Sequence, residues 1–205
     1  MHSTASETRL RAALPCVLAL LGWMLTAAST APQGFASGAP SPTNGRIRVG
    51  DIAPDFTLQT IDGEPLCLGN CLSDKPTLVV FWSYFCFPCQ KEIPDLQQVY
   101  EELGRDQLSV ISISLDGPAY DDKLRPFLAK HAITFPTVYD NMTAEFFEVA
   151  EKYGVVGTPT SFLLDAQGRV RFMHLGRMDP DTLKGLVRSA REQAFCSEIT
   201  KPSPQ

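Results

Sequence analysis

The sequence predicts a mixed α/β sandwich, in which helices cover a central β-sheet. Two runs of apolar and β-branched residues, 77–82 (TLVVFW) and 108–115 (LSVISISL), have the composition of strands that are buried on both faces. Between them, residues 89–103 carry apolar side chains at helical spacing, so the three segments form a βαβ unit with an expected right-handed crossover. Further strand and helix signals downstream complete the sandwich.

The elements around this unit follow from local signals. Residues 55–60 alternate as an edge strand does, and an Asp-Gly pair at 62–63 marks a turn. The helix at 89–103 ends at Gly104, and we expect Pro94 to bend it because proline cannot donate a backbone hydrogen bond. The apolar stripe of this helix consists of Ile93, Leu96, Tyr100 and Leu103.

The second half of the chain alternates helices and short strands. Its last helix has Asp179 as N-cap and Pro180 at the first helical position. The expected elements are a helix at 121–131 that includes Pro126, a strand at 137–139, a helix at 144–153 that ends at Gly154, a hairpin of strands at 161–164 and 170–174, and the last helix.

The N-terminus predicts an export segment. Arg9 and Arg11 precede an apolar run, 12–28, that ends in small residues, as in a secretory signal peptide. The run is short for a membrane span, but an uncleaved anchor is the competing interpretation. We therefore divide the chain into a signal peptide or membrane anchor at 1–31, a flexible linker at 32–46, a folded domain at 47–196 and a C-terminal tail at 197–205.

Composition restricts the class of protein. Hydrophobic residues make up 44% of the chain and charged residues 20%, which supports a packed core rather than disorder. The formal net charge is -5 and the domain has no basic block, which disfavours nucleic acid as a partner.

The segment at 81–89 (FWSYFCFPC) carries the chemistry. Cys86 and Cys89 lie where a buried strand becomes a helix, so the unpaired N–H groups and the dipole of the helix stabilise the thiolate of the first cysteine. Cys89, one turn later and more buried, then resolves a mixed disulfide. Pro88 lacks an N–H group and limits local motion, which keeps the two sulfurs near bridging geometry.

Two alternatives give this pair no catalytic role. A structural zinc site needs four ligands, and Cys67 and Cys71 supply two more sulfurs, but they precede the buried strand whereas the pair follows it. The three histidines are scattered, so we expect no metal and no other cofactor. The second alternative is an inert structural disulfide between Cys86 and Cys89.

On these motifs the chain resembles the thioredoxin superfamily, and within it the exported branch related to TlpA and ResA. The resemblance covers residues 49–195 and rests on GDIAPDFTL at 50–58, VVFWSYFCFPCQKEIPDL at 79–96 and GVVGTPTSFLLDAQGRV at 154–170. It implies a thioredoxin-like fold with an inserted strand and helix, which matches residues 121–153.

The resemblance also implies a substrate-binding surface around the cysteine pair. The Thr158-Pro159 bond is expected to be cis, to face the dithiol and to offer backbone groups to a substrate chain. The side chains expected to line this surface are Trp82, Phe85, Phe87 and Pro88.

Three positions decide how the family mechanism applies to this chain. Family members usually have Trp directly before the first cysteine, where this chain has Phe85. Val80 replaces the buried Asp of thioredoxins proper, whereas Glu92 matches the acid that ResA-like proteins carry after their CxxC. Because Glu92 lies one turn beyond Cys89, we expect it to accept and return the proton of Cys89. The alternative is a solvated glutamate favoured by the helix dipole.

Peroxiredoxins and copper-delivery proteins share this fold. A peroxidatic cysteine is preceded by a Pro and a Thr or Ser at fixed spacing; Ser83 fits the second position, but Val79 stands where the Pro would be. Copper-delivery relatives use a CxxxC in the active loop, whereas Cys67 and Cys71 have that spacing at another place. We expect His174 to be a half-buried structural residue.

The remaining cysteines allow a structural disulfide. An odd number remains after loss of Cys16 with the signal, so at least one thiol has no intrachain partner. We expect a Cys71–Cys196 disulfide, because the last helix should run away from the dithiol and end near the start of the strand at 77. A Cys67–Cys71 bridge is the main alternative.

The predicted protein is therefore an exported thiol:disulfide oxidoreductase, located in the periplasm or elsewhere outside the cytoplasm. Its expected partners are proteins with cysteine pairs and a membrane or periplasmic thiol donor, with membrane contact only through a possible N-terminal anchor. Phe87-Pro88 supplies no cation and Glu92 is anionic, which favours a reductant, and the relatives suggest cytochrome c maturation. The alternatives are a peroxiredoxin-like peroxidase and a non-catalytic binding module.

Overall fold

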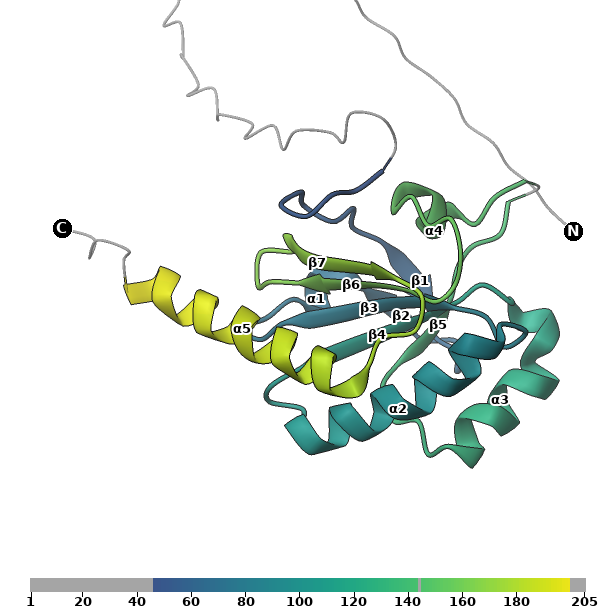
Figure 1. Ribbon diagram of the computed structural model, residues 1–205. Helices are drawn as coiled ribbons and strands as arrows, with labels where there is room; N and C mark the ends of the chain where they lie inside the picture. Colours follow the sequence, from purple (N-terminus) through teal and green to yellow (C-terminus); the bar gives the residue numbers. More distant parts are fainter. Residues whose placement is uncertain (1–45, 144, 200–205) are drawn as a thin grey trace, which may run out of the picture. The chain divides into compact units, whose positions relative to one another are not determined.

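The computed structural model describes residues 46–143 and 145–199, and the side chains of residues up to 192. The predicted export segment at 1–31 and the predicted linker at 32–46, except for its last residue, lie outside these residues. Within them the chain forms a five-stranded sheet and a separate two-stranded hairpin, with helices on both faces of the larger sheet (Figure 1). None of the described helices is long and apolar enough to cross a membrane.

The elements follow one another as the sequence patterns predict. They are β1 (Thr57–Gln59), β2 (Pro65–Cys67), α1 (Leu68–Cys71), β3 (Thr77–Trp82), α2 (Phe87–Leu103), β4 (Ser109–Ser114), a 3₁₀ turn (Pro118–Tyr120), α3 (Asp121–Lys130), β5 (Thr137–Tyr139), α4 (Glu148–Lys152), β6 (Thr160–Leu164), β7 (Val170–Leu175) and α5 (Pro180–Ile199).

The central strand β3 divides the core into two halves. Leu78, Val80 and Trp82 face α2, α3 and α5, which Figure 1 shows on one side of the sheet. Val79 and Phe81 point to the other side, where they pack with residues of β1, α1 and α4. All six residues of β3 are buried, because both faces of the sheet are covered. The predicted mixed α/β sandwich is therefore confirmed.

The strand order β5-β4-β3-β6-β7 determines where the functional loops meet. β4 runs parallel to β3, and β5 runs parallel to β4. β6 runs antiparallel to β3, with Phe81 opposite Thr160. The chain leaves β3 and enters β6 at the same end of these two neighbouring strands, so the two connecting segments lie side by side.

Several elements differ from their predicted bounds. α2 begins two residues earlier than predicted, because Cys86 rather than a later residue is its N-cap. The strand at 55–60 is reduced to β1, which forms its ladder with β2 and not with the larger sheet. α5 continues to Ile199, past the predicted start of the tail at 197.

The helix predicted at 144–153 is reduced to α4, and Asp140 is the reason. Its buried carboxylate accepts hydrogen bonds from the N–H groups of Val149 (2.9 Å) and Ala150 (2.7 Å), which are in the first turn of α4. Just before α4, the N–H of Thr143 donates a hydrogen bond to the carbonyl oxygen of Phe146 at 2.8 Å, so Phe146 is not part of the helix.

The predicted Cys71–Cys196 disulfide is not formed. Cys71 is a free, half-buried thiol, as is Cys67, so the alternative Cys67–Cys71 bridge is not formed either. The side chain of Cys196 lies outside the described residues. The lengths of two elements explain why these cysteines do not meet. From Pro180 to Cys196, α5 extends about 24 Å without a break, whereas β3 spans roughly 20 Å, so the helix is longer than the strand it runs beside. Figure 1 shows the end of α5 projecting beyond the sheet.

Candidate active site

Cys86 and Cys89 lie at the junction between β3 and α2. They are joined by a disulfide, with their Cα atoms 5.2 Å apart, a normal separation for such a bond. Cys86 is the N-cap of α2, and its Sγ accepts a hydrogen bond from the backbone N–H of Cys89 at 3.3 Å. The sulfur of Cys86 therefore takes the place of the oxygen that usually caps a helix.

The two sulfurs have different environments. Cys86 is half-buried, whereas Cys89 is 0% exposed because the first turn of α2 directs it into the core. An incoming disulfide can therefore reach only Cys86. A thiolate at Cys86 would be stabilised by the helix N-terminus, including the N–H group of Cys89. The arrangement separates an attacking sulfur from a resolving one.

The loop before β6 faces this pair. The Thr158-Pro159 bond is cis, as the family resemblance implies. The carbonyl oxygen of Thr158 lies 3.3 Å from the Sγ of Cys86, and Pro159 is buried beneath it. A chain bound to Cys86 therefore passes beside the backbone of Thr158.

Asp116, which the sequence analysis missed, organises the loop that leads to Cys86. One carboxylate oxygen accepts the Ser83 hydroxyl at 2.5 Å, and the other accepts the Tyr84 N–H at 2.7 Å. The Ser83 hydroxyl in turn accepts the N–H of Phe85 at 3.1 Å. The signal was present in the sequence: Asp116 lies two residues after the end of β4, whose carboxyl end lies beside that of β3.

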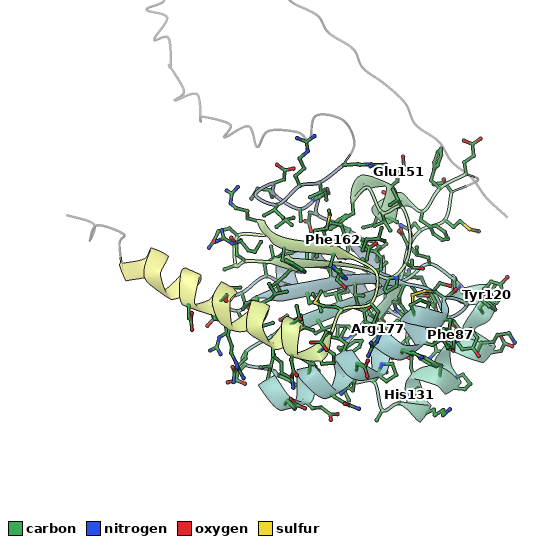
Figure 2. All side chains as sticks on the ribbon, viewed as in Figure 1. Phe87, Tyr120, His131, Glu151, Phe162 and Arg177 are labelled. Atoms are coloured by element: carbon green, nitrogen blue, oxygen red, sulfur yellow. A yellow bond between two sulfur atoms is a disulfide. The ribbon has the colours of Figure 1, made fainter. Side chains whose placement is uncertain are left out.

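Aromatic side chains surround the exposed sulfur. Phe85 and Phe87 flank Cys86 and are 58% and 68% exposed. Phe85 packs edge-to-face on Tyr120, with ring centroids 4.9 Å apart, and the Lys91 ammonium lies 4.7 Å from the ring centre of Phe87. Figure 2 shows Phe87 and Tyr120 at the same end of the domain. These exposed rings offer an apolar surface to a protein substrate.

Trp82 is the exception among the predicted contact residues. It is 0% exposed and its ring packs against Phe127 at 5.7 Å, so it cannot touch a substrate. The reason is strand alternation: the last residue of β3 points to the face of the sheet that α2, α3 and α5 cover, as Leu78 and Val80 do. The prediction of a substrate-binding role for Trp82 is therefore wrong.

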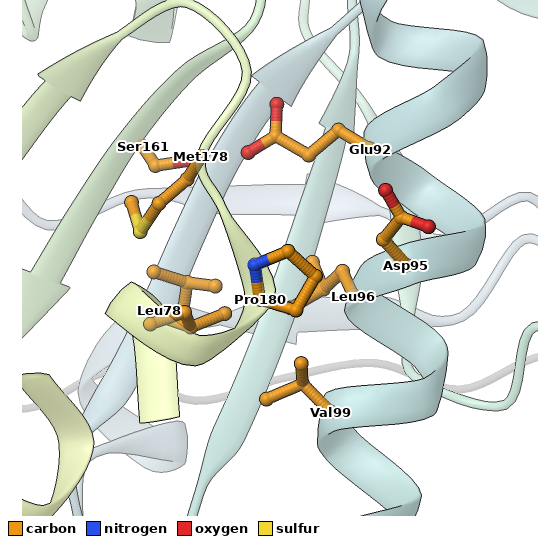
Figure 3. A pocket seen from close by; sticks show the side chains of 9 residues that line it. Leu78, Glu92, Asp95, Leu96, Val99, Ser161, Met178 and Pro180 are labelled. Carbon is orange, nitrogen blue, oxygen red and sulfur yellow. The ribbon is translucent and has the colours of Figure 1, made fainter. Parts of the chain in front are cut away.

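Glu92 is a buried carboxyl group one turn after Cys89. It is 5% exposed, and Figure 3 shows it pointing from α2 into a small pocket toward Ser161 and Met178. Burial raises the pKa of Glu92 to about 7, although the Met178 N–H, the Arg177 charge and the Ser161 hydroxyl lower it in part. Glu92 is thus not the solvated glutamate of the alternative interpretation.

The other candidate residues named from the sequence do not join this site. His174 is half-buried and stacks on Phe172, as expected for a structural residue. Cys67 ends β2 and Cys71 ends α1, so both precede β3, whereas the Cys86–Cys89 disulfide follows it. Among residues 46–143 and 145–199, no group of three or more His, Cys, Asp or Glu side chains could hold a metal ion.

Comparison with known proteins places this geometry in a family. Residues 49–173 match the model of the AhpC/TSA family. The thioredoxin-like protein YneN of Bacillus subtilis is 31% identical over 64% of this chain and 74% of its own length. The thiol-disulfide oxidoreductase ResA of Oceanobacillus iheyensis is 30% identical over 71% of this chain and 74% of its own length.

A solved structure agrees with these relatives. The thioredoxin-family thiol:disulfide interchange protein from Chlorobium tepidum has a TM-score of 0.59 and 27% identity to this chain, over 71% of this chain and 98% of that one. The domain, the cysteine pair at the start of α2 and these similarities lead to one conclusion. The chain belongs to the AhpC/TSA family, in its thioredoxin-like branch of ResA-related proteins.

Proposed function

We propose that this protein is an extracytoplasmic thiol:disulfide oxidoreductase that exchanges its Cys86–Cys89 pair with cysteine pairs of other proteins. The observation that carries the proposal is the half-buried Sγ of Cys86 at the N-terminus of α2, bonded to a fully buried Cys89 and 3.3 Å from the Thr158 carbonyl. Relatives that are named thiol-disulfide oxidoreductases support it.

The reaction proceeds in two displacements. In the reduced protein, the Cys86 thiolate attacks one sulfur of a substrate disulfide, and the other substrate sulfur leaves as a thiolate. Cys89 then transfers its proton to Glu92 and attacks the Cys86 sulfur, which releases the second substrate sulfur. Two electrons pass to the substrate, and the protein is left with its internal disulfide.

Glu92 suits this proton transfer. A carboxyl group accepts a proton well when its pKa lies near the working pH, and burial raises the pKa of Glu92 to about 7. The group is therefore ionised often enough to take the Cys89 proton near neutrality and is protonated often enough to return it. Its place on the buried side of α2, one turn beyond Cys89, supports the assignment.

The proposed direction is reduction. The residues between the cysteines, Phe87 and Pro88, carry no charge that would stabilise the Cys86 thiolate, so the dithiol is a comparatively strong reductant. We place the protein outside the cytoplasm on the basis of the N-terminal pattern at 1–31. A thiol donor in the membrane or periplasm would regenerate it, and cytochrome c maturation is one pathway such a reductant serves.

Insulin reduction by the full chain, with a glutathione buffer as electron source, tests the proposal. Cys86→Ser should remove all activity above the uncatalysed rate, and Cys89→Ser should accumulate a mixed disulfide at Cys86. Cys71→Ser is the matched control, since it removes a half-buried thiol on α1. A wild-type rate no faster than the uncatalysed rate would refute the proposal and favour a binding module with an inert disulfide, whereas full activity of Cys86→Ser would refute the role of Cys86 as the attacking sulfur.

The peroxidase alternative has its own readout. Hydrogen peroxide should not be consumed faster by the reduced protein than by free dithiothreitol. Val79, at the position of the peroxiredoxin proline, is a fully buried core residue and offers nothing to a peroxide.

A further inference from the structure

The pocket in front of Glu92 contains a second carboxylate and an ion pair that the mechanism does not yet use. Asp95 follows Glu92 by one helical turn, and Figure 3 shows both side chains on the face of α2 that borders the pocket. The side chain of Asp95 is 28% exposed, so it lies between the buried Glu92 and solvent. The residues that line the rest of the pocket are mainly apolar: Leu78, Leu96, Val99, Met178, Pro180 and Leu183.

Arg177 links Asp95 to the loop between β7 and α5. Its guanidinium donates to a single Asp95 oxygen from Nε, at 3.2 Å, and from a terminal nitrogen. The next residue, Met178, is buried and directs its backbone N–H toward the carboxyl of Glu92. Two adjacent residues of this loop therefore contact Asp95 and Glu92, which are one turn apart on α2.

The charges around Glu92 oppose each other. The positive charge of Arg177 lowers the pKa of Glu92, whereas the negative charge of Asp95 raises it. Asp179, the N-cap of α5, also acts on Arg177. Ser161 on β6 also lines the pocket, and the titratable His174 on β7 is paired with Ser161 in the sheet. The opposing charges that act on Glu92 are therefore those of the Asp95–Arg177 ion pair.

We propose that Asp95 and Arg177 are positioning residues for the exchange reaction: by holding Arg177 away from Glu92, Asp95 sets the pH range in which Glu92 takes the proton of Cys89. This inference rests on the proposed role of Glu92. Each residue acts through Glu92 and neither touches the reacting sulfurs. The ion pair spans 82 positions of sequence, so it forms only in the folded domain.

Two single substitutions distinguish this electrostatic role from a purely steric one, in which the ion pair only covers the pocket and keeps water out. In Asp95→Asn, Arg177 is released toward Glu92, so the midpoint of the Glu92 titration should fall. In Arg177→Gln, Asp95 loses its partner and its charge acts fully on Glu92, so the midpoint should rise. Each shift is expected to be on the order of half a pH unit for a partly screened charge. If the ion pair only covered the pocket, both substitutions would admit water, and both would lower the midpoint of the Glu92 titration.

The measurement is an NMR titration of the full oxidised chain labelled with ¹³C in its glutamate carboxyl groups, with the Glu92 signal identified by its loss in Glu92→Gln. The rate of insulin reduction is recorded over the same pH range. Lys184→Gln is the matched control, because Lys184 also joins α5 to α2, through Glu102 at 2.5 Å, but about 15 Å along α2 from Glu92. The double variant Asp95→Asn/Arg177→Gln should titrate near the wild type.

The outcomes are distinct. Opposite shifts of the Glu92 midpoint, followed by the pH profile of the rate, support the proposal. Shifts in the same direction, or shifts equal to that of Lys184→Gln, overturn it. If the Glu92 midpoints shift in opposite directions but the pH profile of the insulin-reduction rate does not change, Asp95 and Arg177 control the titration of Glu92. That result would refute the role of Glu92 in proton transfer.

Discussion

Burial of Glu92 should make the stability of the domain depend on pH in a predictable direction. Its pKa rises from 4.5 to about 7 on folding, so the folded state holds the proton more tightly than the unfolded chain. The stabilisation this provides is complete below about pH 4.5 and is lost as the pH rises through about 7. At 1.36 kcal/mol per pH unit, the loss amounts to about 3 kcal/mol.

Replacing Glu92 with Gln removes the titration and keeps the shape of the side chain. The free energy of unfolding of Glu92→Gln, relative to wild type, should therefore increase by about 3 kcal/mol between pH 4.5 and pH 8. Urea denaturation of both proteins in the disulfide form, at a series of pH values, measures this difference without titration of Cys86 and Cys89.

A control substitution isolates the effect of burial. Glu151→Gln removes the same charge from an exposed position on α4, labelled in Figure 2, and its stability difference from wild type should not follow the pattern of Glu92→Gln. A constant stability difference between Glu92→Gln and wild type over this pH range would show that Glu92 ionises as an exposed carboxyl does. The reasoning on its proton transfer would then be refuted.

Three further predictions concern the loop, the core and the free thiols. Asp116→Ala should cost about 1–3 kcal/mol and slow insulin reduction, because the Ser83 hydroxyl and the Tyr84 N–H lose their acceptor; thermal unfolding and the insulin assay measure the two effects. Tyr153→Phe should cost about 1–2 kcal/mol in urea denaturation, since the buried hydroxyl donates to the Pro54 carbonyl at 2.9 Å, and an unchanged midpoint would contradict this. Non-reducing peptide mapping should find free thiols at Cys67 and Cys71 and a disulfide between Cys86 and Cys89; a Cys71–Cys196 peptide would instead restore the pairing predicted from the sequence.

Elements with a local cause could be predicted from the sequence. The continuous apolar run of β3 is sufficient to indicate a strand buried on both faces. Asp179 caps α5 as its position before Pro180 predicts, and its carboxylate accepts the Thr182 N–H at 3.0 Å. The cysteine pair was found in the same way, because the strand, the pair and the helix are consecutive in the chain.

Features that depend on distant contacts were missed or misjudged. Asp116 reaches Ser83 across 33 positions, and Asp140 shortens α4 by binding N–H groups that lie ahead of it in the chain. Trp82 belongs to a motif near the cysteines, yet its direction is determined by the alternation of β3. In each case the deciding partner lies on another element, so sequence proximity alone could not reveal it.

Under the proposed mechanism, the difference in burial between the two cysteines gives a physical reason for an acid at position 92. A single helical turn presents Cys86 to solvent and hides Cys89, which prevents the resolving thiol from reacting with external disulfides. The same burial prevents Cys89 from losing its proton to water, so a base must be available inside the protein. Val80 excludes a base on β3, and the next turn of α2 supplies one in Glu92. The sulfur that is protected from solvent and the buried carboxyl group are thus two consequences of one helix orientation, which the core packed against α2 holds in place.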